Sequence, residues 1–133
     1  MKTFTVKIRH DGKLGAGTDS DPFNGRMLDQ AIAAIKGSTL NDTPVLIRLL
    51  EGRFETFGIA PGDNWRIEGT GAATTLFLKD VTTLGFHHPD NYVISTPWSG
   101  GLPWVKTFGL KNLTLDCGFS GQSARGMHAV KFG

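Results

Sequence analysis

Apolar and polar residues alternate along most of this chain with a period of about two, which is typical of strands with one buried face. In the first such run, residues 3–9, Phe4, Val6 and Ile8 share one face. Strands are also predicted in six later stretches between turns: PVLIRLLEG, NWRIEGTG, TTLFLKDV, NYVIST, FGLKNLTLDCG and GMHAVKFG. With 18 Gly and 6 Pro to make turns, this pattern favours a mostly β protein.

One stretch has the helical period of about 3.6 residues instead. Its apolar residues recur on one face: Phe23, Met27, Leu28, Ala31, Ile32 and Ile35. Asp21 is a suitable N-cap, Pro22 suits the first helical position, and Gly37 is a natural stop. We therefore predict a helix over about 22–36, with polar side chains such as Asp29 exposed to water.

The strands after this helix recur at a regular distance. Ile47, Ile67, the 92–94 region and the pair Leu113 and Leu115 follow one another at intervals of roughly 20–24 residues, a typical solenoid period. A repeat this short buries its apolar face only by stacking on the next turn of chain. The predicted fold class is therefore all-β, a right-handed parallel β-helix, with equivalent strands about 4.8 Å apart.

The same reasoning predicts one domain over residues 1–133. Residues 1–40 would form a capping strand and helix over one end of the stack, and residues 41–133 the first coils. Because no second capping element follows, we expect either a longer protein of which this is the N-terminal part, or another chain over the far end. A homotrimer or self-association through that uncapped end would supply such a cover. A small sandwich with antiparallel hairpins is the competing fold.

Several segments, in order, resemble right-handed β-helix proteins of the pectate lyase superfamily. The quoted stretches are GTDSDPFNGRMLDQAIAAI, VLIRLLEGRF, NWRIEGTGAATTLFL, NLTLDCGFSGQ and GMHAVKFG. The chain departs from the family pattern in two places. Asp-Ser-Asp stands where family loops carry Thr-Asp-Asp, and PVLIRLLEG lacks the usual proline before its glycine.

The resemblance implies a polysaccharide partner and an extracellular or periplasmic location. The implied activity is that of a polysaccharide lyase or glycoside hydrolase, with its catalytic coils beyond residue 133. The alternative is a non-catalytic carbohydrate-binding or structural module, such as a phage tail spike or a surface adhesin. No cofactor is implied for this stretch, although calcium serves several lyases of this shape. No catalytic residue of the family matches a position here.

Two carboxylates are candidates for catalysis, Glu68 and Asp116. If Ile67 and Leu115 were equivalent inward residues, both carboxylates would point outward, two strands and about 9.6 Å apart. That separation lies at the edge of the range of about 6.5–9.5 Å used by inverting glycosidases. The competing interpretation is that both are solvated residues near turns.

Aromatic residues in PWSGGLPW are candidates for sugar binding. Trp98 and Trp104 flank this Gly- and Pro-rich loop, and Tyr92 comes shortly before it. Exposed aromatic rings stack on sugar faces. The alternative is that these rings anchor the loop on the core.

Charge and composition narrow the partners further. The net charge is only +2 and the basic residues are scattered, which argues against nucleic acid and anionic membranes. The start MKTFTVKIRHDG has no continuous apolar run, so we expect no signal peptide there. No metal site is predicted, because adjacent His87 and His88 would face opposite sides of a strand. Asp19, Asp21 and Asp42 are interpreted as turn and cap residues.

Overall fold

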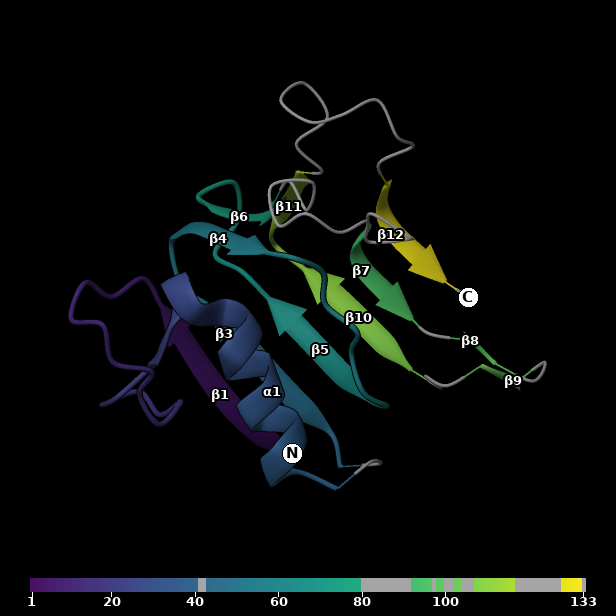
Figure 1. The fold of residues 1–133 in the computed structure, drawn as a ribbon, viewed down its shortest axis with the longest axis horizontal. Coiled ribbons are helices and arrows are strands. Elements are labelled where there is room, and N and C mark those ends of the chain that lie inside the picture. The colour runs from purple at the N-terminus through teal and green to yellow at the C-terminus, as the bar shows by residue number, and fades with distance from the viewer. Residues whose placement is uncertain are drawn as a thin grey trace, which may run out of the picture.

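The computed structural model describes residues 1–40, 43–79, 92–96, 98–99, 102–103, 107–116 and 128–132. Its elements, shown in Figure 1, are β1 (Lys2–Lys7), β2 (Phe23–Asn24), a 3-10 turn η1 (Gly25–Met27), α1 (Leu28–Ser38), β3 (Val45–Leu49), β4 (Gly52–Thr56), β5 (Trp65–Glu68), β6 (Thr74–Leu78), β7 (Tyr92–Thr96), β8 (Trp98–Ser99), β9 (Leu102–Pro103), β10 (Phe108–Lys111), β11 (Thr114–Asp116) and β12 (His128–Phe132).

Two parallel sheets organise these elements. The larger has five strands in the order β10-β5-β3-β1-β2, and the smaller has three in the order β11-β6-β4. All neighbours within these two sheets run parallel. Strands β12 and β7 form a separate parallel pair, and β8 and β9 a short antiparallel one.

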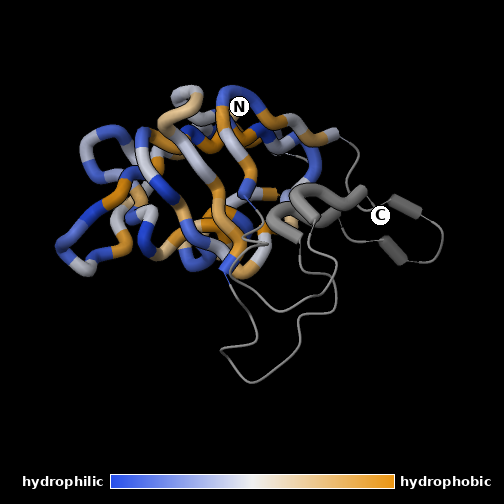
Figure 2. Tube along the Cα trace, turned by 90° about the horizontal axis from the view of Figure 1, so that it is seen from above, coloured by the Kyte–Doolittle hydropathy of each residue, from blue (hydrophilic) through white to orange (hydrophobic). Residues whose placement is uncertain are grey.

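The inward side chains of the larger sheet are aligned across its strands. Phe4 of β1 lies opposite Ile47 of β3, Ile47 opposite Ile67 of β5, and Ile67 opposite Leu110 of β10. Ile47 and Ile67 are fully buried. The tube in Figure 2 shows the alternation behind this, with hydrophobic and hydrophilic residues following one another along the strands. The strand predicted at residues 3–9 is present as β1 but ends earlier, at Lys7, and the parallel register of Ile47 with Ile67 is confirmed.

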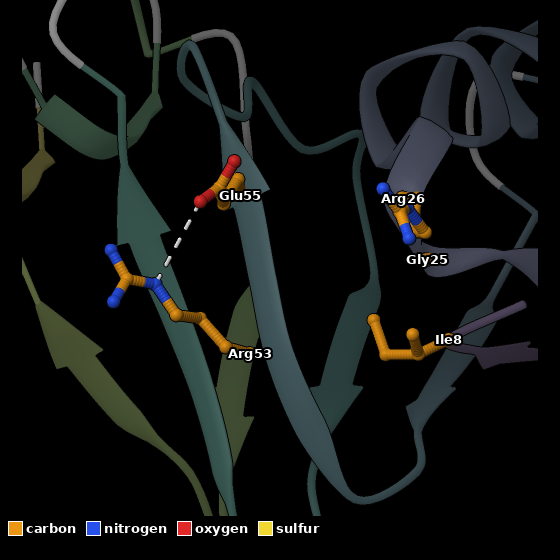
Figure 3. Close-up of a pocket in the computed structure, with 5 residues that line it drawn as sticks. All are labelled: Ile8, Gly25, Arg26, Arg53 and Glu55. Carbon is orange, nitrogen blue, oxygen red and sulfur yellow. Dashed lines mark ion pairs between the residues drawn. The ribbon is translucent and has the colours of Figure 1, made fainter. Parts of the chain in front are cut away.

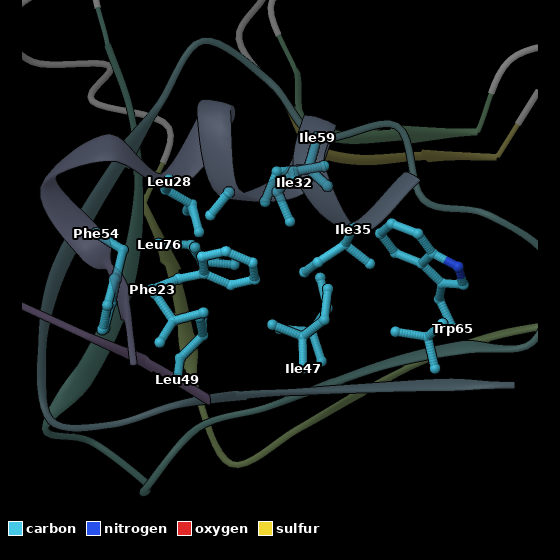
Figure 4. Packing of buried hydrophobic residues seen from close by; sticks show 14 of the residues in the cluster. Phe23, Leu28, Ile32, Ile35, Ile47, Leu49, Phe54, Ile59, Trp65 and Leu76 are labelled. Atoms are coloured by element: carbon cyan, nitrogen blue, oxygen red, sulfur yellow. The ribbon is translucent and has the colours of Figure 1, made fainter. Parts of the chain in front are cut away.

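Helix α1 supplies a large share of the core. Leu28, Ala31, Ile32 and Ile35 are all buried and belong to the same cluster as the inward residues of the sheets. In Figure 4 the labelled helix residues face Ile47, Leu49 and Trp65 across the core. The helix therefore covers a sheet face and closes the core from the side.

The helix begins later than predicted. Pro22 precedes the short strand β2, and the first turn after it is the 3-10 turn, whose N-cap is Asn24. The Asn24 side chain accepts a hydrogen bond from the backbone N–H of Arg26 at 3.0 Å. The carboxylate of Asp21 is instead paired with Arg9, whose Nη1 lies 2.7 Å from Asp21 Oδ1. Gly37 does not end the helix, which continues to Ser38.

The predicted fold class is wrong. The described chain is a mixed α/β fold with two parallel sheets, of five and three strands, one α-helix and no closed solenoid. The spacing of apolar strands indicates which strands pair in parallel. It does not indicate how the core is closed, because an inward residue looks the same whether a sheet or a helix lies above it. Here α1 takes that place.

The predicted repeat also breaks down in its later part. The 92–94 region lies in β7, which pairs with β12 outside the larger sheet, so the neighbour of Ile67 is Leu110. Leu115 lies in the smaller sheet, opposite Leu76. A single ladder at constant spacing does not form, because successive apolar strands belong to different sheets.

Candidate functional site

Strand β4 was not predicted, and it carries much of the candidate site. It begins at Gly52, shortly after β3 ends at Leu49, and has the two-residue alternation of a strand. Phe54 and Thr56 are buried and Arg53 and Glu55 are exposed. The signal was present in the sequence but lay within a segment interpreted as a glycine turn.

The outer face of the three-stranded sheet gathers the side chains that we call the outer site: Arg53, Glu55, Phe77 and Asp116. Glu55 of β4 lies opposite Phe77 of β6, and Phe77 lies opposite Asp116 of β11. The half-buried ring of Phe77 therefore has a carboxylate beside it on each neighbouring strand, Glu55 on β4 and Asp116 on β11.

Arg53 lies over this ring. Its Cζ is 3.8 Å from the centroid of Phe77, a cation–π contact, and its Nε is 3.8 Å from Glu55 Oε1. The side chains of Arg53 and Glu55 remain 59% and 51% exposed, so this ion pair is loose and solvated. The Phe77 ring holds the guanidinium of Arg53 in place, and the N–H groups of that guanidinium stay within reach of a ligand.

A hollow of about 320 Å³ adjoins the outer site on the other side of β4. Its lining residues, drawn in Figure 3, are Ile8, Gly25, Arg26, Arg53 and Glu55. Arg26 Nη1 lies 3.0 Å from His10 Nδ1. The hollow shares Arg53 and Glu55 with the outer site, so the two lie side by side along β4.

Helix α1 fixes the carboxyl end of β4. Asp29 accepts hydrogen bonds from the hydroxyl of Thr56 and, at 3.0 Å, from the backbone N–H of Phe57. The prediction that Asp29 faces water is wrong, because this carboxylate is partly buried and ties the helix to the strand. Asp29 therefore sets the position of β4 relative to the core.

The two predicted catalytic carboxylates do not lie on one ladder. Glu68 ends β5 in the larger sheet, opposite Arg48 and Lys111, while Asp116 lies in the smaller sheet. The carboxylate that shares a row with Asp116 is Glu55, two strands away. Two strand spacings separate their Cα atoms by about 9.6 Å.

A second charged cluster, at the glycine-rich loop after β1, is structural. Arg9 donates to Asp11 at 2.5 Å, to Asp21 at 2.7 Å and to the carbonyl oxygen of Pro22 at 2.7 Å. The hydrogen bond from Arg9 holds the pKa of Asp11 below its ordinary value, and the bonds to Asp11 and Asp21 raise the pKa of Arg9. Asp19 accepts a hydrogen bond from Thr5 at 2.6 Å. Asp19 and Asp21 thus hold the loop after β1, and the interpretation of Asp21 as a helix cap is wrong, because the N-cap is Asn24.

The predicted aromatic platform falls largely beyond the described side chains. Tyr92 and Trp98 lie in β7 and β8, and Trp104 lies outside the described residues. His87, His88 and Asp42 also lie outside them. Sugar binding by Tyr92, Trp98 and Trp104 stays a prediction.

In the described part of the chain, no group of three or more His, Cys, Asp or Glu side chains is arranged to hold a metal ion. No described helix is long and apolar enough to cross a membrane. No protein-family model matches this chain, and neither curated proteins nor solved structures gave a match.

Proposed function

We propose that the outer site binds a saccharide, lying across strands β4, β6 and β11. The observation that carries this proposal is the row Glu55–Phe77–Asp116, with Arg53 stacked on the ring. The row places an aromatic surface, a planar cation and two carboxylates on one accessible face.

These groups match the chemistry of a sugar. Carboxylates accept hydrogen bonds from hydroxyl groups, and a guanidinium donates several from a fixed plane. An aromatic ring offers an apolar surface to the C–H face of a sugar ring. The adjoining hollow, with Arg26 and the apolar Ile8, extends this surface beyond β4. The sequence resemblance suggested the same class of ligand from other residues.

A binding panel with matched variants tests this proposal. Neutral and acidic oligosaccharides are titrated into the protein, and affinity is measured by calorimetry or by NMR shifts. Phe77→Ala is expected to weaken binding at least about tenfold, because it removes the ring and the support of Arg53. The matched control is Phe57→Ala, since Phe57 also carries a stacked cation, Lys79 at 4.6 Å, but lies outside the row. Equal loss in both variants, or no binding by the wild-type protein, would refute the proposal.

Glycoside hydrolysis is a second candidate function, favoured by one observation. Glu55 and Asp116 flank Phe77 on either side, and about 9.6 Å between their Cα atoms is compatible with an inverting pair. Reducing-sugar release would then fall in Glu55→Gln and in Asp116→Asn, while saccharide binding persists. Unchanged reducing-sugar release by Asp116→Asn would eliminate glycoside hydrolysis by this pair. Unsaturated products that absorb in the ultraviolet would indicate a lyase instead.

A further inference from the structure

The outer face of the larger sheet contains a second hollow, of about 270 Å³, at strands β5 and β10. We call it the Gly109 bowl. Its outward lining residues are Arg66, Glu68, Thr107, Gly109 and Lys111, and Ile67, Phe108 and Leu110 also line it. Gly109 lies opposite Arg66, and Lys111 lies opposite Glu68. Gly109, between Thr107 just before β10 and Lys111 at its end, leaves its outward position without a side chain.

The space above Gly109 is open to a ligand. Among the described residues, a Cβ atom added at Gly109 would meet only the Cγ of Arg66, at 3.6 Å, which is an ordinary contact. The backbone of Gly109 is not in the left-handed region, so conformational strain does not explain a glycine here. The sheet has room for a side chain at position 109, and the residue there is nevertheless a glycine.

The charges around the bowl are mainly positive. Glu68 has Arg48 opposite it on β3 and Lys111 opposite it on β10, so its negative charge is offset from both sides. Arg66 lies opposite the aliphatic Leu46 on one side and Gly109 on the other. The outward positions of β3, β5 and β10 hold three cations and one carboxylate, Arg48, Arg66, Lys111 and Glu68, and therefore carry a net charge of +2.

These cations remain available to a ligand. Among the described side chains, Arg66, Arg48 and Lys111 make no ion pair, and all three are exposed. This contrasts with Arg9, whose guanidinium is occupied by two carboxylates and a carbonyl oxygen. A guanidinium and an ammonium beside an open hollow suit a multiply charged oxyanion.

We propose that the Gly109 bowl binds phosphate, either as the free ion or as a monoester carried by a sugar. A phosphate monoester carries a charge of about −1.5 to −2 at pH 7 and has three strong acceptor oxygens. It therefore matches the net charge of this face better than a single carboxylate does. Arg66 and Lys111 bind the phosphate oxygens, and the remainder of the ligand occupies the space above Gly109. This proposal goes beyond saccharide binding at the outer site, because the two sites lie on different sheets.

The test uses inorganic phosphate, glucose 6-phosphate and glucose as probes, titrated at constant ionic strength and followed by calorimetry and NMR shifts. Saturable binding of phosphate or glucose 6-phosphate is expected, with shifts at Gly109 and little response to glucose. Tighter binding of glucose 6-phosphate identifies the monoester as the preferred ligand, and equal binding identifies the free ion as sufficient. Arg66→Gln is expected to weaken binding at least about tenfold, because it removes a charged hydrogen-bond donor.

Matched variants separate this site from general charge effects. Lys13→Gln makes the same change of charge on the loop after β1 and should alter affinity less than about twofold. Gly109→Leu fills the bowl without removing a charge and should abolish binding. Gly37→Leu, at a position with no atom within 4 Å, is its control.

The proposal would be overturned if the protein did not bind phosphate, or if Arg66→Gln bound it as tightly as the wild-type protein. It would also be overturned if Lys13→Gln lost binding to the same extent as Arg66→Gln. A final contrary result would be glucose moving the NMR signal of Gly109 as strongly as glucose 6-phosphate does. If Gly109→Leu fails to fold, the exposed Arg66 variant still decides. Phe77→Ala should leave phosphate affinity unchanged, so failure of either proposed site is distinguishable from failure of the other.

Discussion

The two faces of the three-stranded sheet are built on the same strands and the same register, yet they differ in almost every other respect. Inward, Phe54 lies opposite Leu76 and both are fully buried. Outward, one residue along, Glu55 is 51% exposed and lies opposite the half-buried Phe77. Backbone pairing is shared, so the side chains alone make one face a core and the other a candidate binding surface.

The inner face is also held more tightly by its neighbours. Gly25 approaches the Phe54 ring so closely that a Cβ atom there would overlap it. Asp29 fixes the end of β4. On the outer face, Arg53 makes a cation–π contact with Phe77 and a loose, solvated ion pair with Glu55. We therefore expect substitutions on the inner face to change stability and those on the outer face to change binding.

The largest effect is expected for Phe54→Ala. Loss of a fully buried phenylalanine leaves a cavity and should reduce the free energy of unfolding by about 3–5 kcal/mol, measured by urea denaturation. Phe77→Ala, on the opposite face, should reduce it by less than about 1 kcal/mol, since an exposed cation–π contact contributes little. Equal destabilisation by the two variants would contradict the contrast between the faces.

Asp29→Ala should have the next largest effect. It leaves the buried hydroxyl of Thr56 and the N–H of Phe57 without their acceptor, which should reduce the free energy of unfolding by about 1–3 kcal/mol. The control is the exposed Gln30→Ala on the same helix, expected within about 0.5 kcal/mol of the wild-type protein. If the two helix variants behaved alike in thermal unfolding, Asp29 would not hold β4.

Gly25→Ala tests the close approach at the inner face. The added methyl group must displace the Phe54 ring, which should destabilise the protein by about 1–3 kcal/mol. Gly37→Ala, on the open side of the helix, should instead stabilise it by up to about 1 kcal/mol. Denaturant midpoints measured under identical conditions compare the two. A stabilising Gly25→Ala would show that the ring moves freely, and the inner face would then be less constrained than we argue.

The smallest effect is expected for the exposed pair of Arg9 and Asp11. Because Arg9 lowers the pKa of Asp11 in the folded protein, the pair stabilises the fold above the ordinary pKa of Asp. That contribution is lost as the pH falls through the lowered folded value. Asp11→Asn should therefore be slightly less stable than the wild-type protein between about pH 5 and 8, where an ordinary Asp carboxyl is ionised, and the difference should shrink below about pH 4. Thermal unfolding across this range measures it, and a difference that grows on acidification would be contrary to the assigned pair.

The strand patterns alone predicted part of the fold and one residue of the candidate outer site, Asp116. Alternation predicted the strand at residues 3–9 and the regions that contain β3, β5 and β6, and the spacing predicted the register of Ile47 with Ile67. Asp116 was singled out, but its row partner was not. Glu55 lies in β4, whose short alternation follows a glycine turn directly and was not separated from it.

What the sequence by itself determined is which face the residues of the predicted strands take, because that follows from local alternation, and the parallel pairing of Ile47 with Ile67, which follows from their spacing. Only the tertiary structure decided how the core is closed, since a buried residue carries no mark of whether a helix or a sheet covers it. Tertiary structure also decided which charged groups form ion pairs within the protein. Arg9, in the loop after β1, pairs with Asp11 and Asp21, whereas Arg66, within β5, lies opposite Leu46 and Gly109 and stays exposed.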